Sequence, residues 1–154
     1  MEQNNLKAFR AKLLESKKVG LDSMIFLYQF ADHPTYAPLT EIVFELLEQN
    51  KLISVTTTIT IAEVFVRAEE KQDQITIAAY EQFFHTVPHL DIISVDWYVA
   101  RLASKLRAKY KTIRLPDALQ VSAPLLKNYS LFLTNDEKMK KVKEIEVMML
   151  DEYC

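Results

Sequence analysis

Short apolar runs alternate with segments of helical periodicity along most of this chain. Strand-like runs, several rich in β-branched residues, are predicted at 19–21, 52–58, 90–95, 131–134 and 145–150. Helical segments are predicted at 24–31, from after Pro34 to about Asn50, at 59–71, 74–86 and 96–110, and from 115 onward. Strands separated by helices pair in parallel, because parallel neighbours need crossover connections. The pattern therefore predicts an α/β domain whose mostly parallel sheet is covered by helices on both faces.

The first 18 residues precede this alternating pattern. Leu6, Phe9, Leu13 and Leu14 recur at helical spacing, which predicts an amphipathic N-terminal helix over residues 1–18. The remaining residues, 19–154, are predicted to form one domain, because a chain of 154 residues is close to the usual size of a single domain and no linker or internal repeat divides it.

Glycine is almost absent from the chain. Average usage predicts about 11 glycines at this length, and there is one, Gly20. The phosphate-binding loops of nucleotide-binding proteins, the glycine loop of kinases and the G-x-S-x-G turn of hydrolases all need several glycines close together. The sequence excludes these sites. Cys154 is the only cysteine, so the chain can form no internal disulfide and no thiolate zinc site.

Composition and hydropathy indicate the cellular location of the protein. No apolar run approaches the roughly 18 residues of a membrane span, and the first segment has no apolar core followed by a small-residue cleavage site. A lone cysteine suits a reducing compartment. We therefore expect a soluble cytoplasmic protein without a membrane partner. The net charge of −2 does not by itself indicate binding to nucleic acid.

Four acidic residues stand at junctions between predicted strands and helices: Asp22, Glu63, Asp117 and Asp136. Each has a simple structural explanation. Asp22 and Asp136 suit helix N-caps, Asp117 complements the dipole at a helix start, and Glu63 could complete a capping box with Thr60.

Together, the four acids predict more than capping. If the topology brings these junctions to one sheet edge, two charges about 4 Å apart repel by roughly 4 kcal/mol at an effective dielectric near 20, whereas a cap returns only about 1 kcal/mol. A divalent cation resolves that conflict, and ligation by oxygen alone favours Mg²⁺ or Mn²⁺. Such a cation orients a phosphate ester and activates water, which predicts phosphodiester hydrolysis.

The residues around the acids resemble the PIN domain family of metal-dependent ribonucleases, which includes the VapC-type toxins. The motifs, in the order of the family, are Leu21-Asp22-Ser23, Ile61-Ala62-Glu63-Val64, Leu115-Pro116-Asp117-Ala118-Leu119 and Leu131-Phe132-Leu133-Thr134-Asn135-Asp136. The resemblance covers about residues 19–150. It implies a three-layer α/β/α fold with a five-stranded sheet in the order 3-2-1-4-5, a Mg²⁺ or Mn²⁺ site formed by the four acids, and endonucleolytic cleavage of RNA.

The same resemblance assigns supporting roles near the acids. Thr134 and Asn135 match the polar pair beside the last acid of the family, and Ser23 supplies a hydroxyl where threonine is usual. Two positions depart from the pattern. Met24 replaces the asparagine or serine often found there, and Pro124 is expected to interrupt the helix that carries Asp117.

Two functions are consistent with these observations. The first is a metal-dependent endoribonuclease that serves as the toxin of a toxin–antitoxin pair, with RNA as substrate and an antitoxin protein as partner. The alternative is a catalytically weak PIN-like module that binds RNA or protein without cutting, which the two departures permit. Metal-dependent cleavage distinguishes the two.

Basic residues next to the acids are candidates for RNA binding. Arg114 and Lys138 each lie within three residues of a predicted ligand, so we expect them to contact the RNA backbone. Arg101, Lys105 and Lys109 recur at spacing i, i+4, where like charges repel, so phosphate contact is one explanation and a solvated face is the other.

Aromatic residues give two further expectations. Phe26, Tyr28 and Phe30 alternate along one predicted helix, so some should face outward and could support a homodimer. Trp97 follows a predicted N-cap and is expected to pack against the domain rather than to stack on a base.

Overall fold

The computed structural model describes residues 3–154, and its centre is a five-stranded sheet in the order β3-β2-β1-β4-β5. The strands are β1 (Lys18–Leu21), β2 (Ile53–Thr57), β3 (Leu90–Ile93), β4 (Leu131–Thr134) and β5 (Glu146–Met149). All four pairings are parallel. The predicted strand order is confirmed, and the strand bounds differ from the predicted ones by two residues or fewer.

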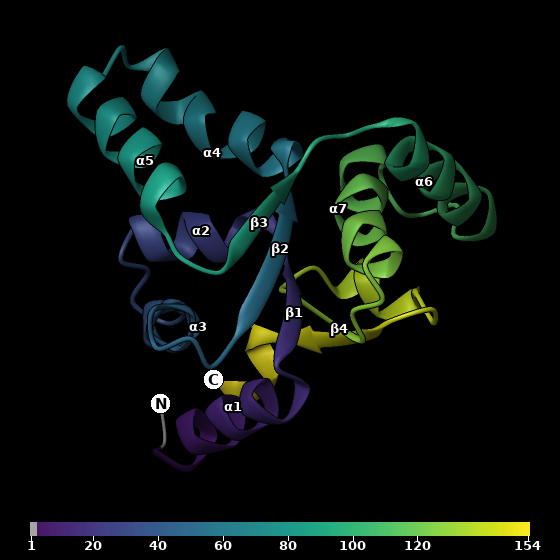
Figure 1. Ribbon diagram of the computed structural model, residues 1–154, viewed down its shortest axis with the longest axis horizontal. Helices are drawn as coiled ribbons and strands as arrows, with labels where there is room; N and C mark the ends of the chain where they lie inside the picture. The colour runs from purple at the N-terminus through teal and green to yellow at the C-terminus, as the bar shows by residue number, and fades with distance from the viewer. Residues whose placement is uncertain (1–2) are drawn as a thin grey trace.

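Helices cover both faces of this sheet (Figure 1). They are α1 (Gln3–Ser16), α2 (Ser23–Phe30), α3 (Ala37–Glu48), α4 (Thr58–Glu70), α5 (Gln74–Thr86), α6 (Trp97–Lys109) and α7 (Leu115–Leu126), with short 3₁₀ helices at Glu137–Lys141 and Leu150–Tyr153. Helices α1 to α5 lie on one side of the molecule, and α6 and α7 form an adjacent pair on the other. The predicted three-layer α/β/α architecture is confirmed.

The apolar core divides between the two faces of the sheet. On one side, Leu21 and Leu133 are fully buried with α1, α2 and α3. On the other side, Phe132 is buried against α6 and α7. Every residue of β4 is buried, as expected for a central parallel strand covered on both faces.

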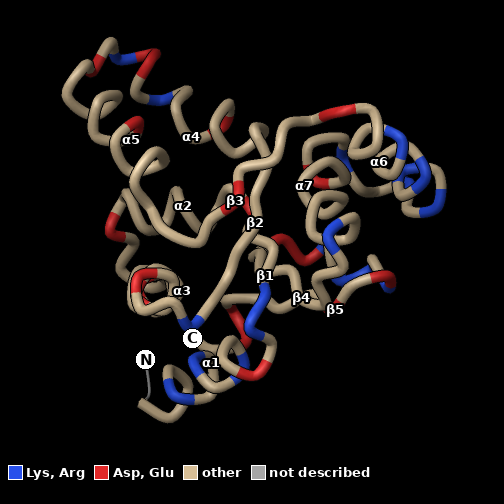
Figure 2. Tube along the Cα trace, viewed as in Figure 1, with Lys and Arg blue, Asp and Glu red and all other residues tan. Residues whose placement is uncertain are grey.

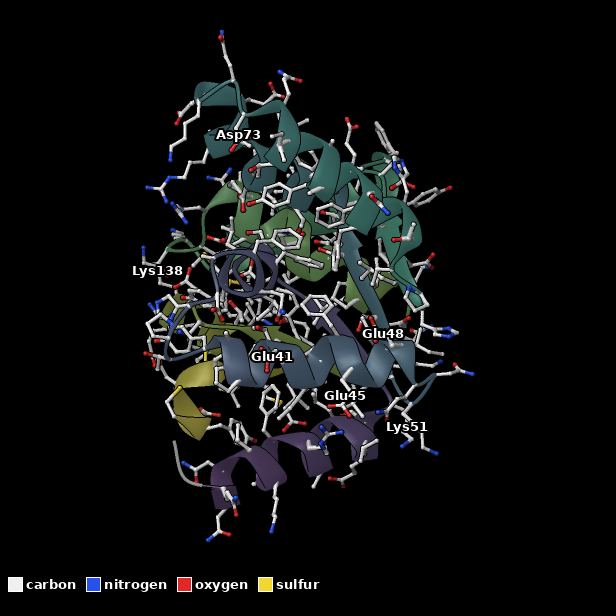
Figure 3. All side chains as sticks on the ribbon, turned by 90° about the vertical axis from the view of Figure 1, so that its left-hand side faces the viewer. Glu41, Glu45, Glu48, Lys51, Asp73 and Lys138 are labelled. Carbon is white, nitrogen blue, oxygen red and sulfur yellow. The ribbon has the colours of Figure 1, made fainter. Side chains whose placement is uncertain are left out.

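The N-terminal helix shares the main core of the domain. Phe9 and Leu13 of α1 are fully buried, and the Phe9 ring meets the Tyr153 ring edge to face with 5.2 Å between centroids. On the outer side, Arg10 forms an ion pair with Glu45 of α3 at 2.5 Å. Figure 3 shows α1 lying below α3, with Glu45 between them. The amphipathic helix predicted at the N-terminus is thus present as Gln3–Ser16.

Helices end here without glycine. Five helices are followed by a residue in the left-handed backbone region, at Lys17, Asp32, Asn50, Gln72 and Asn128. Behind α3, for example, the Asn50 and Lys51 amides donate to carbonyls of the last helical turn at 3.0 and 2.9 Å, as in a Schellman motif. Left-handed backbone costs roughly 1–2 kcal/mol in a residue other than glycine, so the chain gives up some stability at its helix ends.

The single glycine lies where a helix approaches the sheet most closely. A Cβ atom on Gly20 of β1 would lie 2.6 Å from Cγ of Pro124 and 3.0 Å from Cδ2 of Phe132. Real Cβ atoms do not approach that closely, so the contact between α7 and β1 requires glycine at this position.

Pro124 does not interrupt its helix, contrary to the prediction from sequence. Helix α7 continues two residues beyond it to Leu126, and the Pro124 carbonyl accepts a hydrogen bond from the Tyr129 amide at 2.8 Å. Pro124 lies near the end of the helix, where only one intrahelical hydrogen bond is lost. Its ring packs against Gly20, so burial of the ring offsets that loss.

The aromatic residues of α2 face their own chain. Phe26 is fully buried, and the Phe30 ring stacks on Tyr80 of α5 with 4.4 Å between centroids. Of the three rings, of which some were expected to face outward, Phe26 does not, because the α4–α5 pair folds back over α2. A homodimer stays a prediction. Within residues 3–154, no helix is long and apolar enough to cross a membrane.

Candidate active site

The four acidic residues singled out from sequence lie on elements that meet at one edge of the sheet. Asp22 follows the end of β1, and Asp136 follows the end of β4, its direct neighbour. Glu63 lies in the second turn of α4, which begins where β2 ends. Asp117 lies in the first turn of α7, and its charge acts on Asp22. The carboxyl ends of parallel strands are the usual ligand site of such folds.

Asp22 is held by hydrogen bonds from three directions. One carboxylate oxygen, Oδ1, accepts from the Ser23 amide at 2.7 Å, at the start of α2. The other, Oδ2, accepts from the Thr134 hydroxyl at 2.6 Å. The backbone amide of Asp22 donates to the Leu133 carbonyl at 3.1 Å. Asp22 thus caps α2, as the simple structural explanation expected, and its second oxygen is oriented by a separate contact across the sheet.

Two hydroxyls connect Asp22 to other acids. The Ser23 hydroxyl donates to Oε2 of Glu63 and lies 3.3 Å from Oδ1 of Asp22. The Thr134 hydroxyl, which donates to Asp22, accepts from the Asp136 amide at 3.1 Å. A continuous chain of contacts therefore runs from Glu63 through Asp22 to the backbone of Asp136.

The capping box proposed for Glu63 is absent. Helix α4 begins at Thr58, and its N-cap is Thr57, whose hydroxyl accepts from the Ile59 amide at 3.2 Å. Thr60 lies inside the first turn and is fully buried. Glu63 therefore forms no capping box with Thr60, and its carboxylate accepts a hydrogen bond from the Ser23 hydroxyl instead.

Asp117 and Asp136 retain their expected structural roles while adding charge to the site. Asp117 accepts from Nε of Arg114 at 3.3 Å, and Oδ1 of Asp136 accepts from the Lys138 amide at 3.0 Å. Burial raises the pKa of Asp117, Arg114 opposes the rise, and the charge of Asp136 adds to it. The elements place these two acids close enough for their charges to interact.

Asp22 has the most strongly perturbed carboxyl group of the four. Burial raises its pKa from 3.8 to about 6, the Thr134 hydrogen bond acts against the rise, and the charges of Asp117 and Glu63 add to it. Without a cation, the carboxylate form of Asp22 is thus disfavoured by its surroundings. Functional sites often show this combination of burial and like charge.

This pKa predicts how stability depends on pH in the presence of a chelator. A folded-state pKa above the unfolded-state value means that the folded protein binds more protons between pH 4 and 6, so the contribution of Asp22 to stability falls as pH rises through that window. Asp22→Asn removes the titration. We expect its stability relative to wild type to rise between pH 4 and 7, by up to about 3 kcal/mol, as measured by urea unfolding.

Asp73 provides the matched control. Its carboxylate caps α5 through the backbone and hydroxyl of Thr76, which lowers its pKa. Asp73→Asn should therefore show the opposite trend, losing stability relative to wild type as pH rises. If Asp22→Asn and wild type differed by the same amount at every pH, burial of an ionised Asp22 would not be costly.

A buried polar cluster behind the site was not predicted from sequence. The Thr56 hydroxyl donates to the Leu21 carbonyl at 2.9 Å and lies 2.7 Å from the Thr60 hydroxyl. The Gln120 side chain donates to Thr60 at 2.7 Å and accepts from Thr57 at 2.6 Å. All four side chains are buried. They join the end of β1, the first turn of α4 and the middle of α7, which are the elements that carry Asp22, Glu63 and Asp117.

We expect Gln120→Ala to destabilise the protein by about 2–3 kcal/mol, because it leaves the buried Thr57 hydroxyl without its acceptor and opens a cavity. The control is Gln49→Ala, which removes an exposed glutamine that donates to Glu45 at 2.7 Å and should change stability by less than about 0.5 kcal/mol. Chemical denaturation of both variants measures the difference. Equal effects would show that the buried cluster contributes no more than a surface contact.

The remaining predicted site residues differ in their surroundings. Oδ1 of Asn135 accepts from the Asp151 amide at 3.0 Å, so Asn135 holds the C-terminal 3₁₀ helix. Lys138 projects from the surface (Figure 3), and its charge acts on Asp117.

Trp97 is 73% exposed, so the expectation that it packs against the domain is wrong. Trp97 is the first residue of α6, after the N-cap Asp96, and within residues 3–154 no other element covers its ring.

The donor chemistry fits Mg²⁺ or Mn²⁺. The four acids offer carboxylate oxygens, which these ions prefer. Burial, and to a smaller extent neighbouring negative charge, raises the pKa values of Asp22 and Asp117, and a bound cation would stabilise their carboxylate forms. Among residues 3–154, no group of three acidic, histidine or cysteine side chains is arranged so that all three could bind one metal ion. Cation binding would thus involve side-chain rotation of the acids.

Comparison with known proteins agrees with this geometry. The model of the PIN domain family matches residues 19–145. Two solved structures share the fold: VapBC2 from Rickettsia felis bound to a DNA fragment from its promoter (TM-score 0.68, 19% identity, covering 86% of this chain and 98% of that one), and a toxin–antitoxin complex from Klebsiella pneumoniae (TM-score 0.61, 21% identity, 86% and 97%). No curated protein matches the chain significantly. The match over most of its length shows that the chain belongs to the PIN domain family.

Proposed function

We propose that this protein is a Mg²⁺- or Mn²⁺-dependent endoribonuclease and the toxin of a toxin–antitoxin pair. The observation that carries the proposal is the set of four acids at the carboxyl edge of the sheet, with Asp22 buried and its pKa raised to about 6. Such a charge cluster is costly for the folded protein unless a cation is bound there. PIN domains are generally nucleases, and membership of the family supports the same chemistry here.

In this proposal the four acids have different roles. Asp22, Asp117 and Asp136 hold the cation, and Glu63 either contributes through a water molecule or accepts a proton from the attacking water. When bound, the cation supplies charge that orients the scissile phosphate and lowers the pKa of water. Ser23 and Thr134 keep Asp22 oriented through the contacts described above.

Arg114 and Lys138 are proposed to hold the RNA backbone. Nε of Arg114 lies 3.3 Å from the Asp117 carboxylate, with 70% of the Arg114 side chain exposed, and Lys138 lies two residues after Asp136 in the 3₁₀ helix. Both charges oppose the rise in the Asp117 pKa. A polyanion can approach an acidic site only where cations offset the repulsion, and the closeness of both charges to Asp117 supports this role.

The likeness to toxin–antitoxin complexes supports an antitoxin as partner. A homodimer and a cytoplasmic location remain part of the proposal. The test is incubation of the purified chain with single-stranded and loop RNA in Mg²⁺ or Mn²⁺, with and without a chelator. The proposal expects cleavage that the chelator abolishes. RNA binding without cleavage would instead identify a PIN-like binding module.

A further inference from the structure

Helix α6 presents an outer face that the site does not use. We define the α6 surface as Trp97, Tyr98, Arg101 and Lys105, which are exposed and lie on one side of the helix. The Trp97 and Tyr98 side chains are 73% and 70% exposed. The opposite side of the helix, at Val99, Ala103 and Leu106, is buried against α7 and the core. Two neighbouring large aromatic side chains are rarely both exposed to solvent at the start of a helix whose opposite side is well packed.

The charged residues of the α6 surface are all basic. No acidic residue occurs between Asp96 and Asp117 in the sequence, and Figure 2 shows only blue bands along α6 beyond its first residues. Over residues 3–154, the ion pairs of the protein include none with Arg101 or Lys105. Arg101 donates only to the neutral Ser104 hydroxyl, at 3.0 Å. Like charges along one helix repel, so this surface is arranged for an anionic partner.

The C-terminal end of α6 leads to the acidic site. Residues 110–114 connect α6 to α7, and Arg114 reaches Asp117 directly. On the other side of this connection, the Lys141 ammonium donates to the Thr112 hydroxyl at 3.2 Å, and Lys141 belongs to the 3₁₀ helix that Asp136 caps. Helix α6 extends about 20 Å from this point to Trp97. A polyanion held at the acids can therefore continue along α6.

We propose that the α6 surface binds a segment of single-stranded RNA next to the cleavage site, with bases stacked on Trp97 and Tyr98 and phosphates held by Arg101 and Lys105. The inference rests on the proposed function and extends it to a path for the substrate. Exposed rings beside cations are the combination that single-stranded nucleic acid recognises, because every base offers a face for stacking. Duplex RNA keeps its base faces covered, and an acidic protein segment would contact the cations alone.

Trp97 reports on this surface directly, because it is the only tryptophan in the chain. In a chelator, which prevents cleavage, titration of the full-length protein with a short oligouridylate should quench the tryptophan fluorescence. The apparent affinity should fall as salt concentration rises. Arg101→Ala/Lys105→Ala should reduce the slope of log K against log salt by about 1.4, since each lost phosphate contact on a single strand contributes about 0.7.

Two control variants make the test specific. Lys51→Ala/Lys71→Ala removes the same charge from exposed turns beside α3 and after α4, and should leave the slope unchanged. Trp97→Ala should weaken binding of a dye-labelled oligouridylate, followed by anisotropy, by about fivefold or more, whereas Trp97→Phe should retain most of the affinity. Rescue by phenylalanine separates stacking from a loss of folding.

Three results would overturn the inference: no quenching of Trp97, equal salt slopes for the two double variants, or equal quenching by polyglutamate at matched charge, which would assign the surface to an acidic protein segment. The proposed function fails separately, if the wild-type chain never cleaves RNA in Mg²⁺ or Mn²⁺. Because the binding titration is done without cleavage, its outcome does not depend on that result.

Discussion

Asp22→Asn should lower metal-dependent RNA cleavage by at least about 100-fold while the protein stays folded. Loss of residues that only support a metal ligand already costs about 10- to 100-fold, and this change removes the charge of a proposed ligand itself. Asn retains nearly the same shape and can still accept from the Ser23 amide, so α2 keeps its cap. Asp117→Asn should lower RNA cleavage to a similar extent and also stay folded. Cleavage rates in Mn²⁺, with circular dichroism of each variant, measure the effect.

Glu48→Gln is the matched control for these variants. Glu48 is an exposed acid at the end of α3, away from the site (Figure 3), and its replacement removes one negative charge as Asp22→Asn does. It should cleave RNA at the wild-type rate. If Asp22→Asn/Asp117→Asn cleaved as fast as Glu48→Gln, the activity would come from another site or from a contaminant.

Gly20→Ala should destabilise the protein by about 3 kcal/mol or more. Its added Cβ would lie 2.6 Å from Cγ and 2.7 Å from Cβ of Pro124, inside the contact between β1 and α7. Insertion of a methyl group into a well-packed core typically costs about 1–3 kcal/mol, and here both neighbours are rigid: a proline ring and the Phe132 ring at 3.0 Å. Urea unfolding of the variant and wild type gives the difference in free energy.

A double-mutant cycle identifies the clash as the cause. Pro124→Ala removes Cγ, the nearer of the two proline atoms that the new Cβ would meet, and frees the remaining Cβ from the rigid ring. Gly20→Ala should therefore cost less in the Pro124→Ala background than in wild type. Equal costs in the two backgrounds would mean that the destabilisation has another origin, such as the close approach of the new Cβ to the Phe132 ring.

The layer architecture could be predicted from the pattern of the sequence because local and global signals agree, whereas the strand order was implied by the resemblance to the PIN domain family. The run at 131–134, apolar except for Thr134, is typical of a buried strand, and Asp96 begins its helix where N-cap preference places it. The positions of Asp22 and Asp136 at one edge followed from the same topology, since each comes directly or shortly after one of two neighbouring parallel strands.

Side-chain partners across the sheet could not be predicted in the same way. Gln120 is an ordinary helical residue in sequence, and only the packing of α7 on β2 reveals that it joins Thr57 and Thr60. The exposure of Trp97 was missed for a related reason. Its helical setting indicates an amphipathic face, but the ring lies on the side that no other element covers.

Pro124 shows how tertiary packing overrides a local rule. Proline disfavours a helix interior because it lacks the amide donor and its ring needs space. Gly20 on the neighbouring strand provides that space, and the helix continues. The two residues lie more than a hundred positions apart, so neither can be interpreted from its own surroundings in the sequence.

The most direct test of the central claim is Mn²⁺ binding, measured by the loss of the free-ion electron paramagnetic resonance signal during titration of the protein without RNA. The four acids are proposed to form the metal site, so wild type and Glu48→Gln should bind Mn²⁺ with the same saturable affinity. Asp22→Asn and Asp117→Asn should each bind it at least about tenfold more weakly. Equal Mn²⁺ affinity in all four proteins would contradict the assignment of the site.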